Sequence, residues 1–282
     1  MKKLFILSLV VVMMITTGVS FAAPNSLAEI SNGVKWQEGI VAAIGTGVRP
    51  NNIASDAQGT VLARRAAIVD AYRGLAEQIY GVQVDSNTTV EQLMVVEDNT
   101  KTAVSGLIKN AKILKEEQLP NGTYQVILSV NLFGVQDSVA ASIWANKPPA
   151  IAAPMPVKPV ETVQLQNRMV SVNSVTGVIV DCRGLDLDRV MSPIITDDSG
   201  RVIYGAQFID SSFIINYGAV GYAGPDNPND VSRAGDQPIH VKALSLNDFN
   251  RNPVISREDA DKILSANSES GFLRSCPVVF LQ

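Results

Sequence analysis

Histidine and cysteine are scarce in this chain of 282 residues, which has one histidine, His240, and two cysteines, Cys182 and Cys276. Structural zinc sites usually take four nitrogen or sulfur ligands, and the chain offers three such side chains in all. No G-x-S-x-G elbow is present, and a Cys182–His240 pair is the cysteine–histidine combination that we consider for nucleophilic catalysis; a single histidine in a strand more often has a structural role. We therefore expect no metal site and no enzymatic activity.

A complete glycine-rich phosphate loop is also missing. Gly45-Thr46-Gly47 follows an apolar stretch, but the third glycine position of G-x-G-x-x-G is taken by Pro50. No acidic residue ends a second strand at the spacing that dinucleotide-binding proteins use. The stretch is more typical of a tight connection between a strand and a helix, and we expect no bound cofactor.

An excess of positive charge is lacking, since 23 lysine and arginine residues face 27 acidic ones. Without a basic stripe the surface offers little to phosphate groups, so we expect no binding to nucleic acid. Aromatic residues make up 6% of the chain, which argues against a surface that stacks on sugars.

Long apolar runs are absent except at the N-terminus. Lys2 and Lys3 precede an apolar segment over 4–15, and Ser20-Phe21-Ala22 fits the small-x-small pattern of a signal peptidase site. We expect residues 1–22 to be a signal peptide, with the mature chain beginning at Ala23. The run is short for a membrane span, so we expect none after cleavage. No cysteine follows it closely, so we expect no lipid anchor there.

Residues 33–146 have the pattern of an α+β domain. An apolar strand over 36–48 is followed by a helix between Ser55 and Gly81, a strand over 82–86 and a second helix within 89–108. Ser55 and Gln58 fit a capping box at the start of the first helix, and Gly81 is expected to end it in a left-handed conformation. Alternating residues around Pro120-Asn121-Gly122 predict a β-hairpin, and a short helix over 135–145 follows. The order β-α-β-α-β-β predicts helices that pack on one face of a sheet.

Charged residues interrupt the first helix, in the stretch ARRAAIVDAYRGLAEQIYGVQV over 63–84. Asp70 and Arg73 are three residues apart, so we expect them to pair on the helix surface. Arg65 falls between Val61 and Ile68 on the expected apolar stripe. Its stem is therefore expected to pack while its head meets a carboxylate or carbonyl group, although a contact with a partner subunit is an open alternative.

This helix and the hairpin segment SGLIKNAKILKEEQLPNGTYQVILSVNL together resemble the LPP20 family over about residues 36–135. The family includes exported lipoproteins and flagellum-associated outer-membrane proteins. The resemblance implies a cell-envelope protein, often one that assembles into rings or surface structures, with no enzymatic activity and no catalytic residues to carry over. The chain departs from the lipoprotein members because it lacks their lipid-bearing cysteine.

A proline-rich linker over 147–164 and a β-rich α+β domain over 165–282 are predicted to follow. Five prolines between Pro148 and Pro159 favour an extended chain that spaces two domains. Strands are expected over 175–182, around the turn at 197–200, over 239–246 and over 277–281, with one helix after Ser256. The segment from Thr176 to Gly205 resembles C-terminal segments that accompany LPP20-type domains in other envelope proteins.

Cys182 and Cys276 are candidates for a disulfide, because an exported chain reaches an oxidising compartment and strand ends can be neighbours in a sheet. Two buried, reduced thiols are the alternative. Several aspartates could in principle hold a calcium ion, but none lies in a recognisable calcium-binding loop, and turn or strand-edge positions explain them better. These are Asp181, Asp186, Asp188, Asp197, Asp198 and Asp210.

The sequence thus predicts an exported structural or assembly protein of the cell envelope, in the periplasm or at the periphery of the outer membrane. Its expected partners are envelope proteins, a second copy of itself included, with the flagellum or other surface structures as candidate settings. A periplasmic ligand-binding protein is the alternative, and a hydrolase built on the C-terminal domain is a weaker one.

Overall fold

The computed structural model describes residues 31–52, 55–157, 175–225 and 228–282. All of them belong to one compact unit, Ser31–Gln282. The predicted signal peptide lies outside the described residues, and so do residues 158–164 of the predicted linker and 165–174 of the predicted C-terminal domain. No helix in the described ranges is long and apolar enough to cross a membrane.

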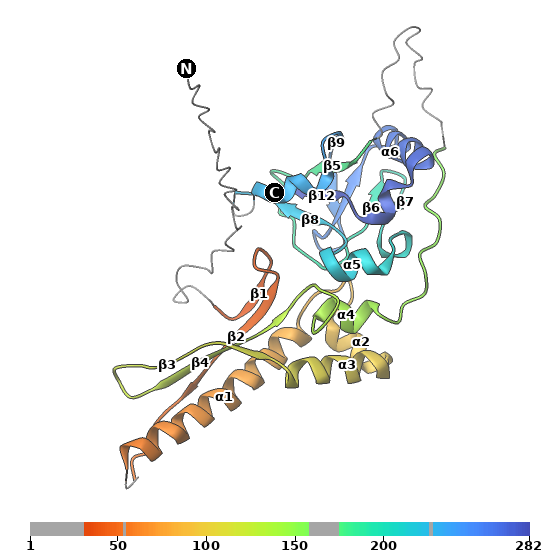
Figure 1. Ribbon diagram of the computed structural model, residues 1–282. Coiled ribbons are helices and arrows are strands. Elements are labelled where there is room, and N and C mark those ends of the chain that lie inside the picture. Colours follow the sequence, from red (N-terminus) through yellow and green to blue (C-terminus); the bar gives the residue numbers. More distant parts are fainter. Residues whose placement is uncertain (1–30, 53–54, 158–174, 226–227) are drawn as a thin grey trace, which may run out of the picture. The chain divides into compact units, whose positions relative to one another are not determined.

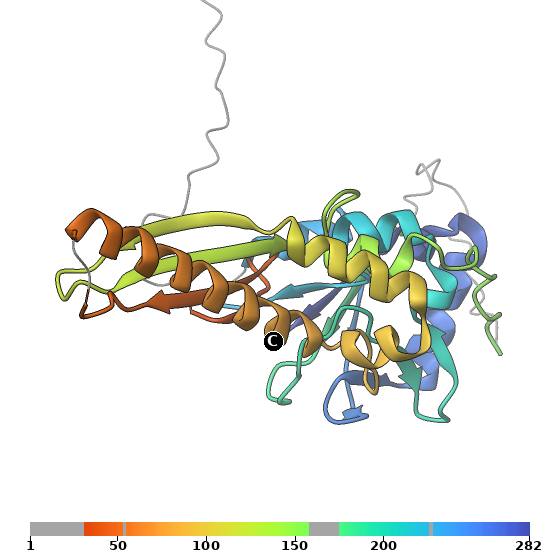
Figure 2. The same cartoon turned by 90° about the horizontal axis from the view of Figure 1, so that it is seen from below.

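The N-terminal part is built on a four-stranded antiparallel sheet with a long helix against one face (Figures 1 and 2). The strand order is β1-β2-β4-β3, with β1 at Gly33–Lys35, β2 at Ile40–Gly47, β3 at Lys112–Gln118 and β4 at Tyr124–Asn131. Helix α1, Asp56–Tyr80, lies along β2 and β4. The predicted α+β class and the β3–β4 hairpin, with Gly122 at φ +81° in its turn, are confirmed.

Helix α1 approaches β2 unusually closely, because small residues face each other. Its buried face is a stripe with i, i+4 spacing, consisting of Gly59, Ala63, Ala67, Ala71, Leu75 and Ile79. A Cβ placed on Gly45 would lie 2.1 Å from the backbone nitrogen of Ala71, and one on Gly47 would lie 1.9 Å from the carbonyl oxygen of Ala63. The glycines singled out in Gly45-Thr46-Gly47 therefore serve helix packing.

Three details of the predicted helices are wrong. Ser55 begins α1 but makes no side-chain capping bond, and Gly81 ends it in a right-handed conformation, not a left-handed one. The second helix is two, α2 at Val90–Val96 and α3 at Asp98–Lys109. The capping box lies at Thr89 and Gln92, whose side chains each bond the other's backbone nitrogen.

The expected strand over 82–86 is also wrong, since only an isolated bridge between Gln83 and Thr89 forms there. The reason is that this backbone bonds to the C-terminal part. Met191 N–H donates to the carbonyl of Gln83 at 3.1 Å, and Ser192 N–H donates to that of Val84 at 2.8 Å. The observed order, β1-β2-α1-α2-α3-β3-β4 followed by α4 at Val139–Trp144, replaces the predicted β-α-β-α-β-β.

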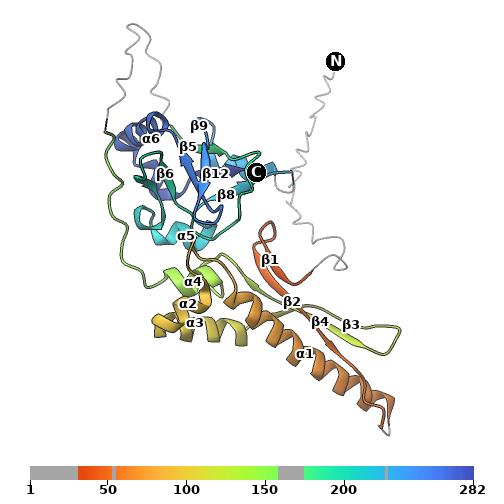
Figure 3. The same cartoon turned by 180° about the vertical axis from the view of Figure 1, so that it is seen from behind.

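The C-terminal part contains two further four-stranded sheets. The first, in the order β8-β12-β5-β9, is all parallel, and its strands lie side by side in Figure 3. They span Gly221–Ala223, Val278–Leu281, Gly177–Asp181 and Pro238–Lys242. The second has the order β10-β11-β6-β7, at Ser245–Asn247, Asn252–Ile255, Ile195–Asp197 and Val202–Tyr204. Helices α5, Ser211–Tyr217, and α6, Arg257–Ser270, accompany them, with 3-10 turns at Ala206–Phe208, Pro228–Ala234 and Phe272–Ser275.

The two parts contact each other through several kinds of interaction. Arg251 donates to the carbonyl of Ser86 at 2.6 Å, and Gly134 N–H donates to that of Ile215 at 2.7 Å. The rings of Trp36 and Tyr222 meet edge to face, with centroids 5.7 Å apart. That residues 33–146 and 165–282 fold independently across a linker over 147–164 stays a prediction.

The close packing of α1 on β2 yields a direct test. Replacement of Gly45 by alanine should lower the free energy of unfolding by about 1–3 kcal/mol, because the new Cβ meets helix backbone that cannot move aside. The control is Gly106→Ala in α3, where nothing lies within 4 Å of the added Cβ and helix propensity gains about 1 kcal/mol. Denaturant titration measures both. Equal stability of the two variants would contradict the packing.

Candidate partner-binding surface

The outward side of α1 carries an uninterrupted row of exposed side chains. Because the buried residues Ala63, Ala67 and Ala71 face the sheet, side chains two positions away point about 200° from them, into solvent. This row consists of Val61, Arg65, Val69 and Arg73, all exposed. Val61 and Val69 are 65% and 64% exposed, which is high for large apolar residues on a helix that packs on a sheet. We call this row, with Leu62, Ala66 and Asp70 beside it, the outer face of α1.

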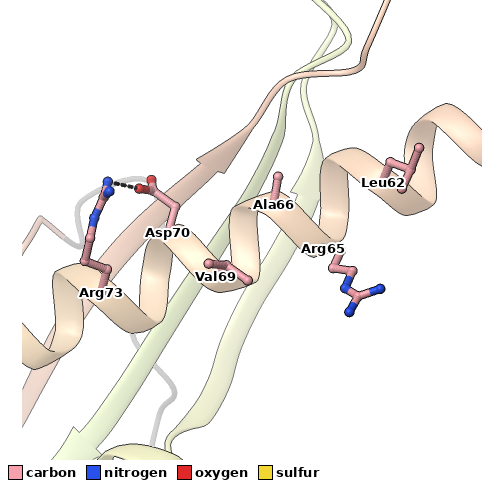
Figure 4. Close-up of a pocket in the computed structure, with 6 residues that line it drawn as sticks. All are labelled: Leu62, Arg65, Ala66, Val69, Asp70 and Arg73. Carbon is pink, nitrogen blue, oxygen red and sulfur yellow. Dashed lines mark hydrogen bonds and ion pairs between the residues drawn. The ribbon is translucent and has the colours of Figure 1, made fainter.

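A shallow hollow of about 380 Å³ lies in the outer face (Figure 4). Its lining residues are Leu62, Arg65, Ala66, Val69, Asp70 and Arg73. Residues 62, 65, 66 and 69 have the spacing i, i+3, i+4, i+7, and so do 66, 69, 70 and 73. Four residues with this spacing form the hole that receives a side chain of a second helix in knobs-into-holes packing. The small side chain of Ala66, shared by both sets, makes the hollow.

Asp70 holds one border of this surface in place. Its carboxylate accepts a hydrogen bond from Arg73 at 2.6 Å and another from the backbone N–H of Thr46 at 3.0 Å. The predicted Asp70–Arg73 pair is confirmed. The bond to Thr46 was not predicted, and it satisfies a donor on the edge of β2 beyond the reach of β1.

The other flank of α1 is closed by an ion pair that sequence reasoning missed. Arg64 donates from Nε and Nη2 to the two carboxylate oxygens of Glu116 on β3, at 2.7 and 3.2 Å. The pair joins residues 52 positions apart, so only the paired strands of the fold reveal it. The opposite flank of α1, which consists of Leu62, Ala66 and Asp70, is not covered by β3 and remains accessible.

The expected packing of Arg65 is wrong. Its side chain is exposed, and within the part of the chain that the structure describes it has no hydrogen bond or ion pair. The alanine stripe, not the larger residues Val61 and Ile68, forms the buried face of α1, so Arg65 points to solvent. The alternative role of Arg65, contact with a partner, stays a prediction.

The proposed disulfide between Cys182 and Cys276 is also wrong for this fold, in which both cysteines are free and buried. Strands β5 and β12 are parallel, with Val178 beside Val278. Cys182 follows the end of β5 while Cys276 precedes the start of β12, so six strand positions, about 20 Å, separate them. Disulfides need Cα atoms within about 7 Å. The ends would have been neighbours only if the strands were antiparallel.

The chemistry around the cysteines does not favour catalysis either. Burial raises the pKa of the Cys182 thiol to about 12 and that of the Cys276 thiol to about 11, away from the thiolate form. His240 lies beside Ile179 on the exposed side of β9, whereas Cys182 shares the opposite face of the sheet with Val180. The two side chains therefore do not form a pair.

Three of the six candidate aspartates serve local structure. A hydrogen bond from Arg183 lowers the pKa of Asp181 to about 2. Burial alone would raise the pKa of Asp197, but hydrogen bonds from Ser199 and Arg201 lower it. Asp210 caps α5. Within the described ranges no group of three or more histidine, cysteine or acidic residues is arranged to hold a metal ion.

The exposure of the outer face sets an expectation for stability. Arg65→Ala and Val69→Glu should each change the free energy of unfolding by less than about 0.5 kcal/mol, because neither side chain is packed. Thermal or denaturant unfolding of the separate variants gives the values. A loss of more than about 1 kcal/mol in either would show that the residue has a buried partner.

The separation of the cysteines predicts two free thiols. In native protein both should resist a polar alkylating reagent, and both should react after unfolding without any reductant, as read by intact mass. A linked Cys182–Cys276 peptide pair in a non-reduced digest would contradict the parallel arrangement of β5 and β12.

Comparison with known proteins agrees with the resemblance drawn from the sequence. The model of the LPP20 lipoprotein family matches residues 37–131, which contain strands β2, β3 and β4 and helices α1, α2 and α3. The model of the second domain of Treponema pallidum Tp0624 matches residues 177–282, from β5 to the last residue. No curated protein matches the chain. Over residues 37–131 the chain is therefore similar to the LPP20 lipoprotein family, and this similarity indicates association with the cell envelope.

Proposed function

We propose that this chain is an exported structural or assembly protein of the cell envelope, located in the periplasm or at the periphery of the outer membrane. The similarity of residues 37–131 to a family of lipoproteins supports the location. The predicted leader over 1–22 supports export. A setting in the flagellum or another surface structure is the narrower form of the proposal.

The observation that carries a binding role is the outer face of α1. Apolar side chains on monomeric surfaces usually occur singly, whereas a row of them beside a hollow marks an interaction site. Leu62, Ala66 and Val69 border the hollow on a helix whose other side is packed on the sheet, and exposed Val61 lies one turn from Arg65 on the same face. Arg65 and Arg73 at its border add charges that can select a partner.

Further observations argue against a catalytic role for this chain. Neither matching family is described by an enzymatic activity. The two cysteines are buried with raised pKa values, and the histidine faces away from Cys182. A role in assembly therefore needs fewer assumptions than a hydrolase or a ligand-binding protein.

Cell fractionation tests the proposal. Expressed with its own N-terminus, the chain should appear in the periplasmic or outer-membrane fraction, begin at Ala23, and migrate as a complex larger than one chain after gentle extraction. A cytoplasmic marker protein serves as the control for leakage. Recovery of the chain in the cytoplasm with Met1 intact would contradict export, and a purified preparation with hydrolytic turnover would contradict the absence of catalysis.

A further inference from the structure

We infer that Arg201 and Asp261 form a binding site for an extended peptide backbone on the C-terminal part, and that residues 155–157 of the same chain fill it. The segment 148–157, called the strap below, is then held on the C-terminal part by this site and is released when the site is broken. The inference goes beyond the proposed function and does not depend on it, because it concerns neither the outer face of α1 nor the location of the chain.

The sequence makes the strap an extended chain. The strap follows α4, drawn in green in Figure 1, and has prolines at positions 148, 149, 154 and 156. A proline disfavours helical backbone at the residue before it, so Ala153 and Met155 are restricted to extended conformations. Residues 148–157 form no helix or strand of their own. Their backbone groups therefore need side chains, other backbone or water as partners.

Two backbone groups of the strap meet the charged side chains of the site. The N–H of Val157 donates to Oδ1 of Asp261 on α6 at 3.0 Å, and the carbonyl of Met155 accepts from Nη1 of Arg201 at 3.4 Å. In an extended chain, the carbonyl of one residue and the N–H of the residue two positions later point to roughly the same side. The two side chains thus present a donor and an acceptor to the strap, as a neighbouring strand would. Pro156 lies between the two bonds, where its lack of an N–H removes neither of them.

The site is held in place by the C-terminal part itself. Arg201 donates from Nε to Oδ2 of Asp197 at 2.8 Å and from Nη2 to Oδ1 of Asp261 at 2.7 Å. The side chain of Asp197 is fully buried and accepts further bonds from the N–H and the hydroxyl of Ser199, in the turn between β6 and β7. Bonds between charged groups are short and directional, so they fix the guanidinium between the turn and α6. The donor and the acceptor that the strap uses are therefore set without the strap.

The site contacts the backbone of the strap more than its side chains. Met155 and Val157 are 71% and 67% exposed. A third bond, from the N–H of Ile151 to the carbonyl of Gln207 at 2.8 Å, also uses backbone groups alone. So few bonds hold a free peptide poorly, but the strap is joined to α4, which gives it a high effective concentration at the site. The ligand class is thus an extended backbone of any sequence, and the covalent connection selects the strap.

Distance measurement between two spin labels on the full chain tests the binding of the strap. The labels are placed on Met155→Cys and on Glu269→Cys, which is exposed on α6 about 12 Å along the helix from Asp261, while both native cysteines are buried. This chain should give a narrow distance distribution. Addition of Val157→Pro should remove the narrow peak, because proline has no N–H to donate to Asp261. The matched control, Val157→Ala, keeps the N–H and should keep the peak.

A change on the other side of the same bond supplies a second readout. Asp261→Ala should also remove the narrow peak, and the N–H of Val157 should lose its protection from hydrogen exchange. Lys262→Ala, at the exposed neighbouring position of α6, should change neither. Circular dichroism checks that the variants are folded, and if Asp261→Ala is not, Val157→Pro decides the result. A narrow peak that persists in folded Val157→Pro, or a broad distribution without any change at the site, would overturn the inference.

Discussion

The contact between α1 and β2 is the constraint on which the N-terminal part depends. Gly45 and Gly47 leave room for the helix backbone itself, and Ala63, Ala67 and Ala71 bring that backbone down onto the strand. A helix held so closely is fixed in its rotation as well as its position. The residues on its far side are therefore presented in a fixed array, which is what a binding surface on a helix needs.

This constraint explains why apolar residues occur on both sides of α1. The sheet needs only small side chains from the helix, so the larger Val61, Leu62 and Val69 are not required for the fold and are left in solvent. Exposed valine carries no benefit for a monomer in water, and the free energy of burying it becomes available when a second surface covers it. Packing within the chain thus uses one side of the helix and leaves the opposite side free for the proposed partner.

Most elements of the fold follow from local patterns, whereas the site depends on features that local patterns do not contain. The β3–β4 hairpin is predictable because Pro120-Asn121-Gly122 demands a turn, and Asp70–Arg73 because both residues lie within one helical turn. The orientation of Arg65 was not predictable, since large residues usually form the buried stripe and here alanines do.

Two other errors have the same origin in long-range pairing. The direction of β12 relative to β5 separates Cys182 from Cys276, and no spacing along the chain encodes that direction. Residues 82–86 bond to Met191 and Ser192 across the two parts of the molecule, so a segment with strand-like composition forms almost no strand of its own. The Arg64–Glu116 pair, which joins α1 to β3, is likewise visible only in the folded chain.

The central claim is that the outer face of α1 contacts another protein of the cell envelope, and cross-linking from single introduced cysteines tests it most directly. Val69→Cys places a reactive thiol on this face, while both native cysteines are buried. The account predicts that a thiol-anchored cross-linker at Val69→Cys joins the chain to another protein in envelope preparations, whereas Val95→Cys, at an exposed position of α2, gives no such product. Equal yields from the two positions, or no product from position 69, would contradict it.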